Sequence, residues 1–373
     1  MKICIAGPSF GYGGANIIAA TVGKRMSEKN DVYYYAYQFY DNYSDIPKEK
    51  LFFSSKRKNK MLRKIGKGIE MMIKKEFTPS RYMMKEINEL FDIIEQNKID
   101  IVILNSFIAV TIFAEKIKEK YPNIVIIAWM HESVEHSFGS LTKNYPSAFK
   151  NALRVVNQIV CLTKKDLEKF KKYNGNSRII YNPLQFQSSK KSNLKAPVIS
   201  FTTRLDIKIK GLDYLMEIAQ RLPEGWKIRV AANGRQDQID EFNKLIRNSH
   251  VTEKIDYVGA LQGESLINHY LESSIFLSTS RVESFQLVLI EAMECGLPII
   301  SFDHSGAKEV LEEGKFGILV KNFDTSMMSK EIEELIFNKD KLIELQKKSI
   351  ARANDFKIEK IMDEWNELLE KWM

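Results

Sequence analysis

The amino-acid sequence predicts an α/β protein with two domains, each built around a parallel β-sheet. At 373 residues the chain is too long for one ordinary hydrophobic core. Short apolar runs alternate with helical patterns from end to end, as parallel sheets require. The alternation stops at the polar segment 185–195 and then starts again. We therefore expect a domain boundary near that segment.

The strand candidates fall into two groups, one on each side of the boundary. Those in the first half are residues 2–6, 32–37, 101–104, 124–129, 158–162 and 178–181. Those in the second half are residues 198–202, 227–232, 254–257, 275–278, 298–302 and 317–320. The predicted domains are 1–184 and 197–354, with a linker over 185–196. A final helix over 355–373 places Ile361, Trp365, Leu368, Leu369 and Trp372 on one face.

Composition and cysteine usage are typical of a soluble cytoplasmic protein. Apolar residues make up 44% of the chain and charged residues 28%. The start lacks the long apolar region of a signal peptide, and the most apolar stretch, 101–114, is interrupted by Asn105 and Ser106. Cys4, Cys161 and Cys295 lack the spacing of a metal site or redox pair. We expect all three to be buried and reduced.

Positive charge is concentrated in the first half of the chain. Residues 1–185 hold 30 Lys and Arg against 18 Asp and Glu, a balance of +12, whereas the whole chain carries +8. Segment 56–77 contains nine of these cations, with Met61, Leu62, Ile65, Ile69, Met72 and Ile73 at helical spacing. Two interpretations stay open: a helix lying on an anionic membrane, or a helix that packs its apolar stripe into the core. Nucleic-acid binding is less favoured because aromatic residues are not interleaved with the cations.

The most informative motif is a pair of glutamates, Glu283 and Glu291, eight positions apart around the predicted start of a helix. Backbone N–H groups of residues 284–288 and the helix dipole would attract phosphate. Glu283, outside the helix, would face a sugar, and Glu291 would accept hydrogen bonds from a ribose. The pair therefore indicates a sugar-nucleotide site. An ordinary amphipathic helix, with one capping acid and one solvated acid, is the alternative.

The surrounding motifs carry a family resemblance. Near the glutamates the chain reads ESF, LVLIEAM, GLPII and GILV. Elsewhere it reads GYGGAN at 11–16, His131 after IVIIAW, LTKKDLEKF at 162–170, IIYNP at 179–183, TRLDIKIKGLDYL at 203–215 and YVG at 257–259. Over essentially its whole length the chain resembles the retaining glycosyltransferases of family 4, the glycosyl transferases group 1. The resemblance implies a GT-B fold: two Rossmann-like domains facing each other across a deep cleft, with the last helix returning to the first domain.

The resemblance also implies which residues act on a nucleotide diphosphate sugar. Glu283 would anchor a sugar hydroxyl, His131 would contact the sugar near its reacting centre, and Arg204 and Lys210 would neutralise the diphosphate without a metal. The implied donor-binding set also contains Gly13, Gly14, Leu261, Ser284, Phe285, Gln286, Leu287, Val288 and Glu291. In the family's front-face route the departing phosphate oxygen takes the acceptor proton, and no side-chain nucleophile or essential metal is expected.

Family frequency favours a uridine diphosphate hexose or N-acetylhexosamine as the donor. The acceptor would be a glycan, a lipid-linked sugar or a glycoprotein, in surface polysaccharide or glycoconjugate biosynthesis. Three positions depart from the family pattern: Thr203 stands where a glycine usually precedes the arginine, Gln286 replaces glycine or proline, and Asn233-Gly234 replaces a fuller glycine pair. The last two fall where donor identity is decided.

Other classes of protein remain as alternatives. The glycine-rich turn after the first strand also occurs in dehydrogenases and epimerases, but Asn16 stands where the third glycine should be. His131, Glu132, Glu135 and His136 resemble a metal site, yet the second histidine is five positions on rather than four. A catalytically silent GT-B partner subunit that binds the acceptor is the third alternative. The joint presence of Glu283, Glu291, Arg204, Lys210 and His131 argues against this alternative.

Overall fold

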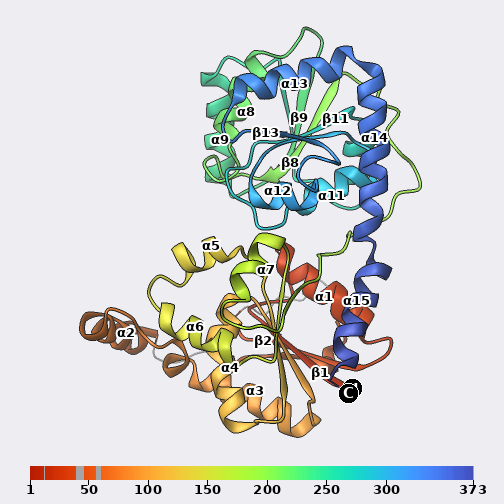
Figure 1. Cartoon of the computed structure of the whole chain (residues 1–373). Coiled ribbons are helices and arrows are strands. Elements are labelled where there is room, and N and C mark those ends of the chain that lie inside the picture. Colours follow the sequence, from red (N-terminus) through yellow and green to blue (C-terminus); the bar gives the residue numbers. More distant parts are fainter. Residues whose placement is uncertain (12, 39–45, 56–59, 373) are drawn as a thin grey trace. The chain divides into compact units, whose positions relative to one another are not determined.

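The computed structural model describes residues 1–11, 13–38, 46–55 and 60–372, without the side chains at positions 60 and 62. The chain divides into two compact units, Met1–Pro183 with Ile358–Met373, and Leu184–Lys357 (Figure 1). Each unit contains one sheet in which every pair of neighbouring strands is parallel. The predicted class, α/β with two Rossmann-like parts, is confirmed.

The sheet of the first unit has the strand order β3-β2-β1-β4-β5-β6-β7. Its strands are β1 (Lys2–Gly7), β2 (Asp31–Ala36), β3 (Leu51–Phe53), β4 (Ile101–Asn105), β5 (Val125–Trp129), β6 (Gln158–Cys161) and β7 (Ser177–Ile179). The sequence predicted all of these except β3. That strand has three residues and pairs only with β2, so it is too short to show a periodicity.

Helices cover both faces of this sheet (Figure 1). The helices of this unit are α1 (Gly14–Met26), α2 (Lys60–Lys74), α3 (Met84–Asn97), α4 (Phe107–Lys120), α5 (Val134–His136), α6 (Pro146–Val155), α7 (Lys164–Phe170) and α15 (Ile358–Glu370), with short turns at Lys48–Lys50, Pro79–Tyr82 and Ser137–Leu141. Helix α2 does not cover the sheet but projects from the side of the unit (Figure 1). Local capping sets the helix starts: the Thr163 side chain accepts from the Asp166 N–H before α7. The central strands β1 and β4 are buried on both faces, which explains their continuous apolar runs.

The final helix α15 belongs to the first unit by its contacts. It lies beside α1 (Figure 1), and Trp365 is fully buried with its ring 4.8 Å from that of Trp129, in an edge-to-face arrangement. Trp129 in turn packs on His131, at a ring separation of 4.8 Å. The last helix of the chain therefore supports a predicted site residue from behind.

The sheet of the second unit has the order β10-β9-β8-β11-β12-β13. Its strands are β8 (Val198–Arg204), β9 (Lys227–Asn233), β10 (Ile255–Gly259), β11 (Ile275–Ser278), β12 (Ile299–Phe302) and β13 (Ile318–Val320). Its helices are α8 (Leu212–Gln220), α9 (Gln236–Asn248), α10 (Glu264–Leu271), α11 (Leu287–Glu294), α12 (Ser305–Val310), α13 (Thr325–Phe337) and α14 (Lys339–Ala353), followed by a turn at Asn354–Phe356. The sequence predicted all six strands.

Both sheets reverse their strand order once, and the reversal decides where a ligand can bind. The reversal falls between β1 and β4 in the first unit and between β8 and β11 in the second. At such a point the loops after the two central strands lead to opposite faces, which opens a crevice at the carboxyl ends of the strands. The glycine-rich turn follows β1, and the two motifs containing Arg204 and Glu283 follow β8 and β11.

The segment between the two sheets lies against the second unit. Lys191 forms an ion pair with Glu294 at 3.1 Å, and the Ser192 N–H donates to the Cys295 carbonyl at 2.8 Å. Cys4, Cys161 and Cys295 are all buried and free, and burial raises the pKa of Cys4 and of Cys295 to about 12. None of the helices in the described part of the chain has the length and apolar content needed to cross a membrane.

Candidate functional site

The loops after β8 and β11 bring Lys210 and Glu283 together. The Lys210 ammonium donates to Glu283 Oε1, and both side chains are largely removed from solvent. The Ser280 hydroxyl donates to the same oxygen at 3.0 Å. All hydrogen bonds that the described residues make to this carboxylate end on Oε1, so Oε2 remains available to accept from a ligand.

A glycine makes this meeting of the two loops possible. Gly211 has a φ of +62°, and a Cβ at this position would lie 2.0 Å from the Thr279 carbonyl oxygen. The Thr279 hydroxyl lies near the carbonyl oxygens of Lys210 and Gly211, at 3.0 and 2.9 Å, and donates to them. The loop after β11 is therefore hydrogen-bonded directly to the backbone of Lys210, whose ammonium group is the buried cation of the site.

Arg281 forms a second clamp between the same two loops. Its guanidinium makes a two-pronged contact with Asp213, at 2.8 and 2.6 Å, and lies 4.0 Å from the centre of the Tyr214 ring. Its backbone N–H donates to the Ile209 carbonyl at 2.8 Å. These contacts fix the path of the chain directly before Glu283.

Arg204 ends β8 at the same edge of the sheet. Its side chain is exposed, and it forms no ion pair with any residue that the structure describes. Thr203, where the family usually has glycine, lies within the strand ladder opposite Ala232. Arg204 thus presents an uncompensated positive charge on a rigid strand end.

Helix α11 begins at Leu287, four residues after Glu283. Ser284 is partly buried, and Phe285 packs on Phe356 at a ring separation of 5.7 Å. The first hydrogen bond of the helix runs from the Leu289 N–H to the Gln286 carbonyl at 3.0 Å, so the N–H groups of Leu287 and Val288 precede it. The side chain of Gln286, the residue before the helix, does not cap this helix start, and the helix dipole there attracts an anion.

The Gln286 side chain points back into the protein. It is buried, and its amide nitrogen lies 2.8 Å from the Ser278 hydroxyl at the end of β11. The Gln286 side chain, which replaces the glycine or proline of the family pattern, therefore packs beneath the start of α11. Only the backbone of Gln286 lies at the amino end of the helix.

Glu291 lies within α11, four residues after the first residue of the helix, and is buried. Its burial excludes the interpretation of Glu291 as a solvated surface acid. The Tyr270 hydroxyl donates to its Oε2 at 3.0 Å. Burial raises the pKa of Glu291 from 4.5 to about 7, although the bond from Tyr270 opposes this. The carboxyl group is therefore close to half-protonated at neutral pH.

Sequence reasoning missed one residue of this site, His304, in the loop between β12 and α12. Its Nδ1 accepts from the Ala307 N–H at 3.2 Å, so Nε2 carries the proton. Nε2 is buried and has no partner among the described residues. Burial lowers the pKa of His304 to about 4; the nearby charge of Glu283 raises this pKa by a smaller amount, and that of Lys210 lowers it further. The imidazole therefore lies within electrostatic reach of the ion pair.

A sequence signal for His304 did exist. The residue stands two positions after the predicted strand 298–302, within the same motif as Glu283 and Glu291. The next residue, Ser305, donates through its hydroxyl to the Glu283 carbonyl oxygen at 3.2 Å. Leu261, also predicted for this site, is half-buried in the loop after β10, two strands away from β8.

The predicted residues of the first unit lie at the carboxyl edge of its own sheet. His131 follows β5, and its Nε2 lies 2.7 Å from Asn105 Oδ1 at the end of β4. With that oxygen as acceptor, Nε2 holds the proton and Nδ1 is a buried acceptor without a partner among the described residues. Burial lowers the pKa of His131 to about 3, so the ring is neutral.

The glycine-rich turn after β1 leads directly into α1. Gly13 caps this helix with a φ of +114°, and the exposed Gly14 is its first residue. Tyr12 lies outside the described residues.

The histidine and glutamate cluster after β5 does not converge on one point. Glu135 forms ion pairs with Lys165 and Lys169, at 3.0 and 2.7 Å. Within residues 1–11, 13–38, 46–55 and 60–372, no group of three His, Cys, Asp or Glu side chains is placed to hold a metal ion.

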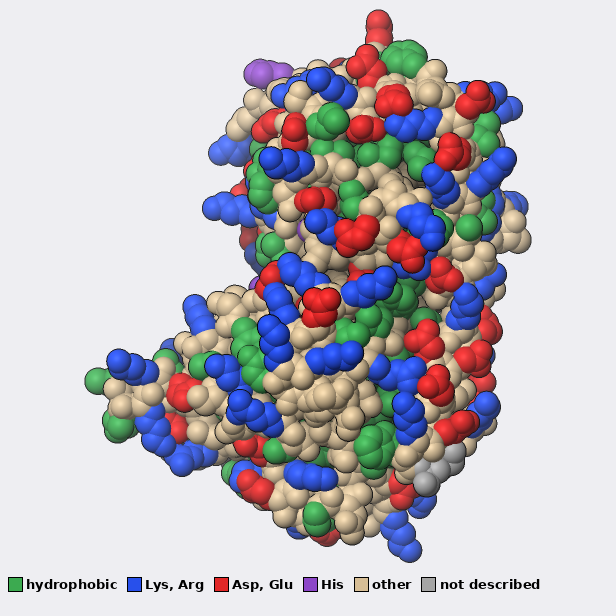
Figure 2. All heavy atoms as spheres, viewed as in Figure 1, with side chains coloured by type: hydrophobic (Ala, Val, Ile, Leu, Met, Phe, Trp, Pro, Cys, Tyr) green, Lys and Arg blue, Asp and Glu red, His purple; other side chains and the backbone are tan. Residues whose placement is uncertain are grey.

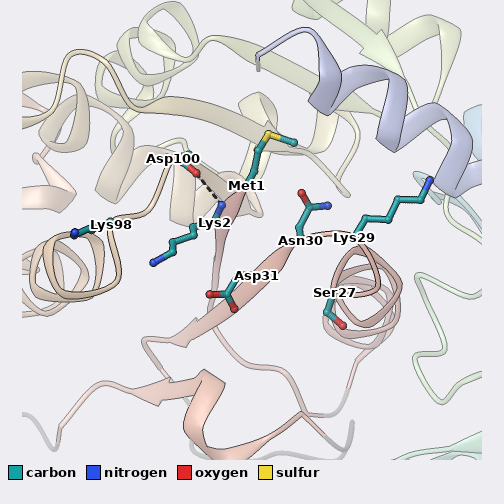
Figure 3. Close-up of a pocket in the computed structure, with 8 residues that line it drawn as sticks. All are labelled: Met1, Lys2, Ser27, Lys29, Asn30, Asp31, Lys98 and Asp100. Carbon is teal, nitrogen blue, oxygen red and sulfur yellow. Dashed lines mark hydrogen bonds between the residues drawn. The ribbon is translucent and has the colours of Figure 1, made fainter.

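An open hollow of about 730 Å³ lies elsewhere, at the amino ends of β1, β2 and β4 (Figure 3). Lys2 and Asp100 are among its lining residues, and the Lys2 N–H donates to the Asp100 carboxylate at 2.8 Å. None of the predicted site residues lines it. In parallel sheets ligands bind at the opposite, carboxyl edge, so we do not assign the donor to this hollow.

Comparison with known proteins agrees with this geometry. Residues 185–355 match the family model described as Glycosyl transferases group 1. An uncharacterized glycosyltransferase of Haemophilus influenzae is 28% identical over 256 residues, which are 66% of this chain and 70% of that protein. The GtfA subunit of a UDP-N-acetylglucosamine–peptide N-acetylglucosaminyltransferase of Streptococcus parasanguinis is 30% identical over 182 residues, 46% of this chain but only 35% of that protein.

Solved structures are similar over the full chain. Anabaena HepE in complex with UDP-glucose has a TM-score of 0.76 at 18% identity, with 100% of both chains covered. The apo form of the lipopolysaccharide outer core galactosyltransferase WaaB has a TM-score of 0.74 at 17% identity, also with 100% of both covered. At such identities the likeness establishes the fold, and it confirms the predicted GT-B fold. Two Rossmann-like units, each with one parallel sheet, define a protein of the GT-B class. Residues 185–355, which lie in the second unit, are a glycosyl transferases group 1 domain, of family 4.

We predict that Gly211→Ala disrupts the site, whereas Gly225→Ala does not. Gly225 also has a positive φ, +80°, but a Cβ there meets nothing within 4 Å. Left-handed strain alone costs about 1–2 kcal/mol, and the clash with Thr279 adds roughly 1–3 kcal/mol at Gly211. Urea unfolding of the two variants measures the difference. Equal losses of stability would contradict the contact between the two loops.

We also predict a pH-dependent effect of Glu291→Gln on stability. The folded chain keeps a proton on Glu291 between pH 4.5 and about 7 that the unfolded chain has lost, so the free energy of unfolding falls as pH rises through this window. The variant lacks this titrating group. Its free energy of unfolding, relative to that of the wild type, should therefore rise by about 3 kcal/mol between low pH and pH ~8. Urea unfolding between about pH 5 and pH 8 measures this rise, with the exposed Glu264→Gln as the control. A difference independent of pH would contradict the burial of a titrating Glu291.

Proposed function

We propose that the protein is a retaining glycosyltransferase that moves a hexose or N-acetylhexosamine from a UDP-sugar to an acceptor. The acceptor is a glycan, a lipid-linked sugar or a glycoprotein, in surface polysaccharide or glycoconjugate biosynthesis. The observation that carries this proposal is the gathering of Arg204, the Lys210–Glu283 pair and the uncapped start of α11 at the switch point of one sheet. The HepE complexes with UDP and UDP-glucose support the choice of nucleotide.

The donor diphosphate is assigned to the positive end of this site. Arg204 has no internal anion to neutralise it, and the N–H groups of Leu287 and Val288 add the partial charge of the helix start. Lys210 is paired with Glu283, and its remaining charge is assigned to the phosphate as well. Two cations and a helix end can stabilise a leaving diphosphate without reorganisation.

The sugar is assigned to the next part of the site. Glu283 Oε2 accepts from a sugar hydroxyl, and the His304 Nε2–H donates to a sugar oxygen. Glu291 accepts from the ribose hydroxyls of the nucleotide. His131, Gly13 and Gly14 are assigned to the donor on the family resemblance, and His131 offers a neutral acceptor nitrogen.

In the transfer step the bond between the sugar's anomeric carbon and the β-phosphate oxygen breaks, and a bond to the acceptor oxygen forms on the same face. The acceptor hydroxyl gives its proton to the departing phosphate oxygen, so UDP leaves and no enzyme side chain is consumed. The protein contributes orientation, which supplies on the order of 7–11 kcal/mol, and electrostatic stabilisation. We place the reaction in the cytoplasm, where three free, buried cysteines stay reduced.

A panel of nucleotide sugars tests the proposed function. UDP-hexoses and UDP-N-acetylhexosamines should raise the melting temperature and release UDP slowly by hydrolysis. Stabilisation by nicotinamide dinucleotides, with no response to any nucleoside diphosphate, would refute the assignment. Donor binding without hydrolysis or transfer to any of the three acceptor classes would instead identify a catalytically silent partner.

We predict that Arg204→Gln and Glu283→Gln each lower kcat/KM for the UDP-sugar by roughly 10- to 100-fold, the value of one charge-assisted hydrogen bond or more. The matched control is Lys208→Gln in the same loop, an exposed cation whose side chain makes no described ion pair; it should change kcat/KM by less than about twofold. The measurement is UDP release under initial-rate conditions. Undiminished transfer by both Glu283→Gln and Glu291→Gln would refute their assigned roles.

A further inference from the structure

Helix α2 of the first unit has its polar side against the protein. Glu70 is 7% exposed and accepts from the Tyr82 hydroxyl at 2.9 Å. Arg63 Nη1 lies 3.4 Å from the Tyr82 carbonyl oxygen and donates to it, and the Lys67 ammonium lies 5.0 Å from the centre of the Phe77 ring. The described polar contacts that hold α2 to the unit are therefore made by charged side chains, whereas an ordinary surface helix is held by apolar ones.

The apolar side of α2 faces solvent. Its exposed side chains are Met61 (77%), Ile65 (50%), Ile69 (54%), Met72 (86%) and Ile73 (75%). No other helix of the described chain exposes more than two large hydrophobic residues. Figure 2 shows these green side chains together with blue ones at the end of the unit that α2 forms. The interpretation that this stripe packs into the core is thus excluded.

Positive charge borders the apolar stripe. Lys64, Lys74 and Lys75 are exposed, while the helix's single acid, Glu70, is turned inward. Cations 56–58 of the same segment lie outside the described residues. An exposed apolar stripe with lysines beside it fits the boundary between acyl chains and anionic headgroups.

We propose that α2 is a docking surface for an anionic lipid bilayer. The five exposed apolar side chains enter the acyl boundary, and the neighbouring lysines contact lipid phosphates. Pairing with a second copy through the same face is disfavoured because it would bring the lysines of both copies together. A nucleic acid is disfavoured because the exposed side chains listed above include no aromatic ring for base stacking. This inference does not rest on the proposed sugar transfer.

Flotation of the full-length chain with vesicles tests the surface. Vesicles of phosphatidylcholine with phosphatidylglycerol should bind the wild type, pure phosphatidylcholine should bind it weakly, and high salt should reduce binding. The triple variant Ile65→Ser, Ile69→Ser, Met72→Ser should lose at least about tenfold in affinity. Lys64→Gln with Lys74→Gln should remove the preference for anionic vesicles. The matched control, Met327→Ser with Phe337→Ser on α13, removes exposed apolar side chains elsewhere and should bind like the wild type.

Two outcomes would overturn the proposal. One is equal vesicle binding by the wild type and the triple variant. The other is a concentration-dependent dimer that the triple variant abolishes, with no vesicle binding by the wild type, which would assign the face to a second copy. UDP-sugar hydrolysis in solution is measured in parallel and should be unchanged in the triple variant. If the wild type binds vesicles as expected but does not hydrolyse any UDP-sugar, that result would count against the sugar transfer alone.

Discussion

The ion pair between Lys210 and Glu283 is the interaction on which the donor site of the second unit depends. Both groups are largely removed from water, so either one alone would leave a poorly solvated charge. The pair therefore holds the loops after β8 and β11 in one arrangement. The close approach of Gly211 to Thr279 and the clamp formed by Arg281 maintain that arrangement from either side.

The pair also explains how charge is divided in the site. Lys210 is largely compensated by Glu283, so the net attraction for a diphosphate comes from Arg204 and the start of α11. Burial lowers the pKa of His131 to about 3 and that of His304 to about 4. Both rings are neutral near pH 7. In the second unit, Arg204 and the start of α11 can thus attract an anion, while the neutral His304 is available to bond a hydroxyl.

The sequence predicted every strand longer than three residues, because apolar runs between turn signals mark buried parallel strands directly. It also predicted a helix shortly after Glu283, and α11 begins there. It could not predict the pairing of Lys210 with Glu283, which are 73 positions apart, or the turn of Gln286 toward Ser278. Periodicity also showed that α2 has two faces but not which one meets the protein. That choice depends on tertiary partners such as Tyr82, which the local pattern does not contain.

The orientation of α2 bears on which acceptor the enzyme uses. The donor site consists of charged and polar groups suited to a water-soluble anion, whereas α2 presents an apolar stripe bordered by cations. A protein held at a bilayer meets membrane-bound molecules at a high local concentration, while a soluble donor reaches it equally well in either state. Attachment therefore favours a lipid-linked sugar over a soluble glycan or a glycoprotein. The buried Glu70 decides this orientation, because turning α2 over would expose its bond to Tyr82 and bury the lysines.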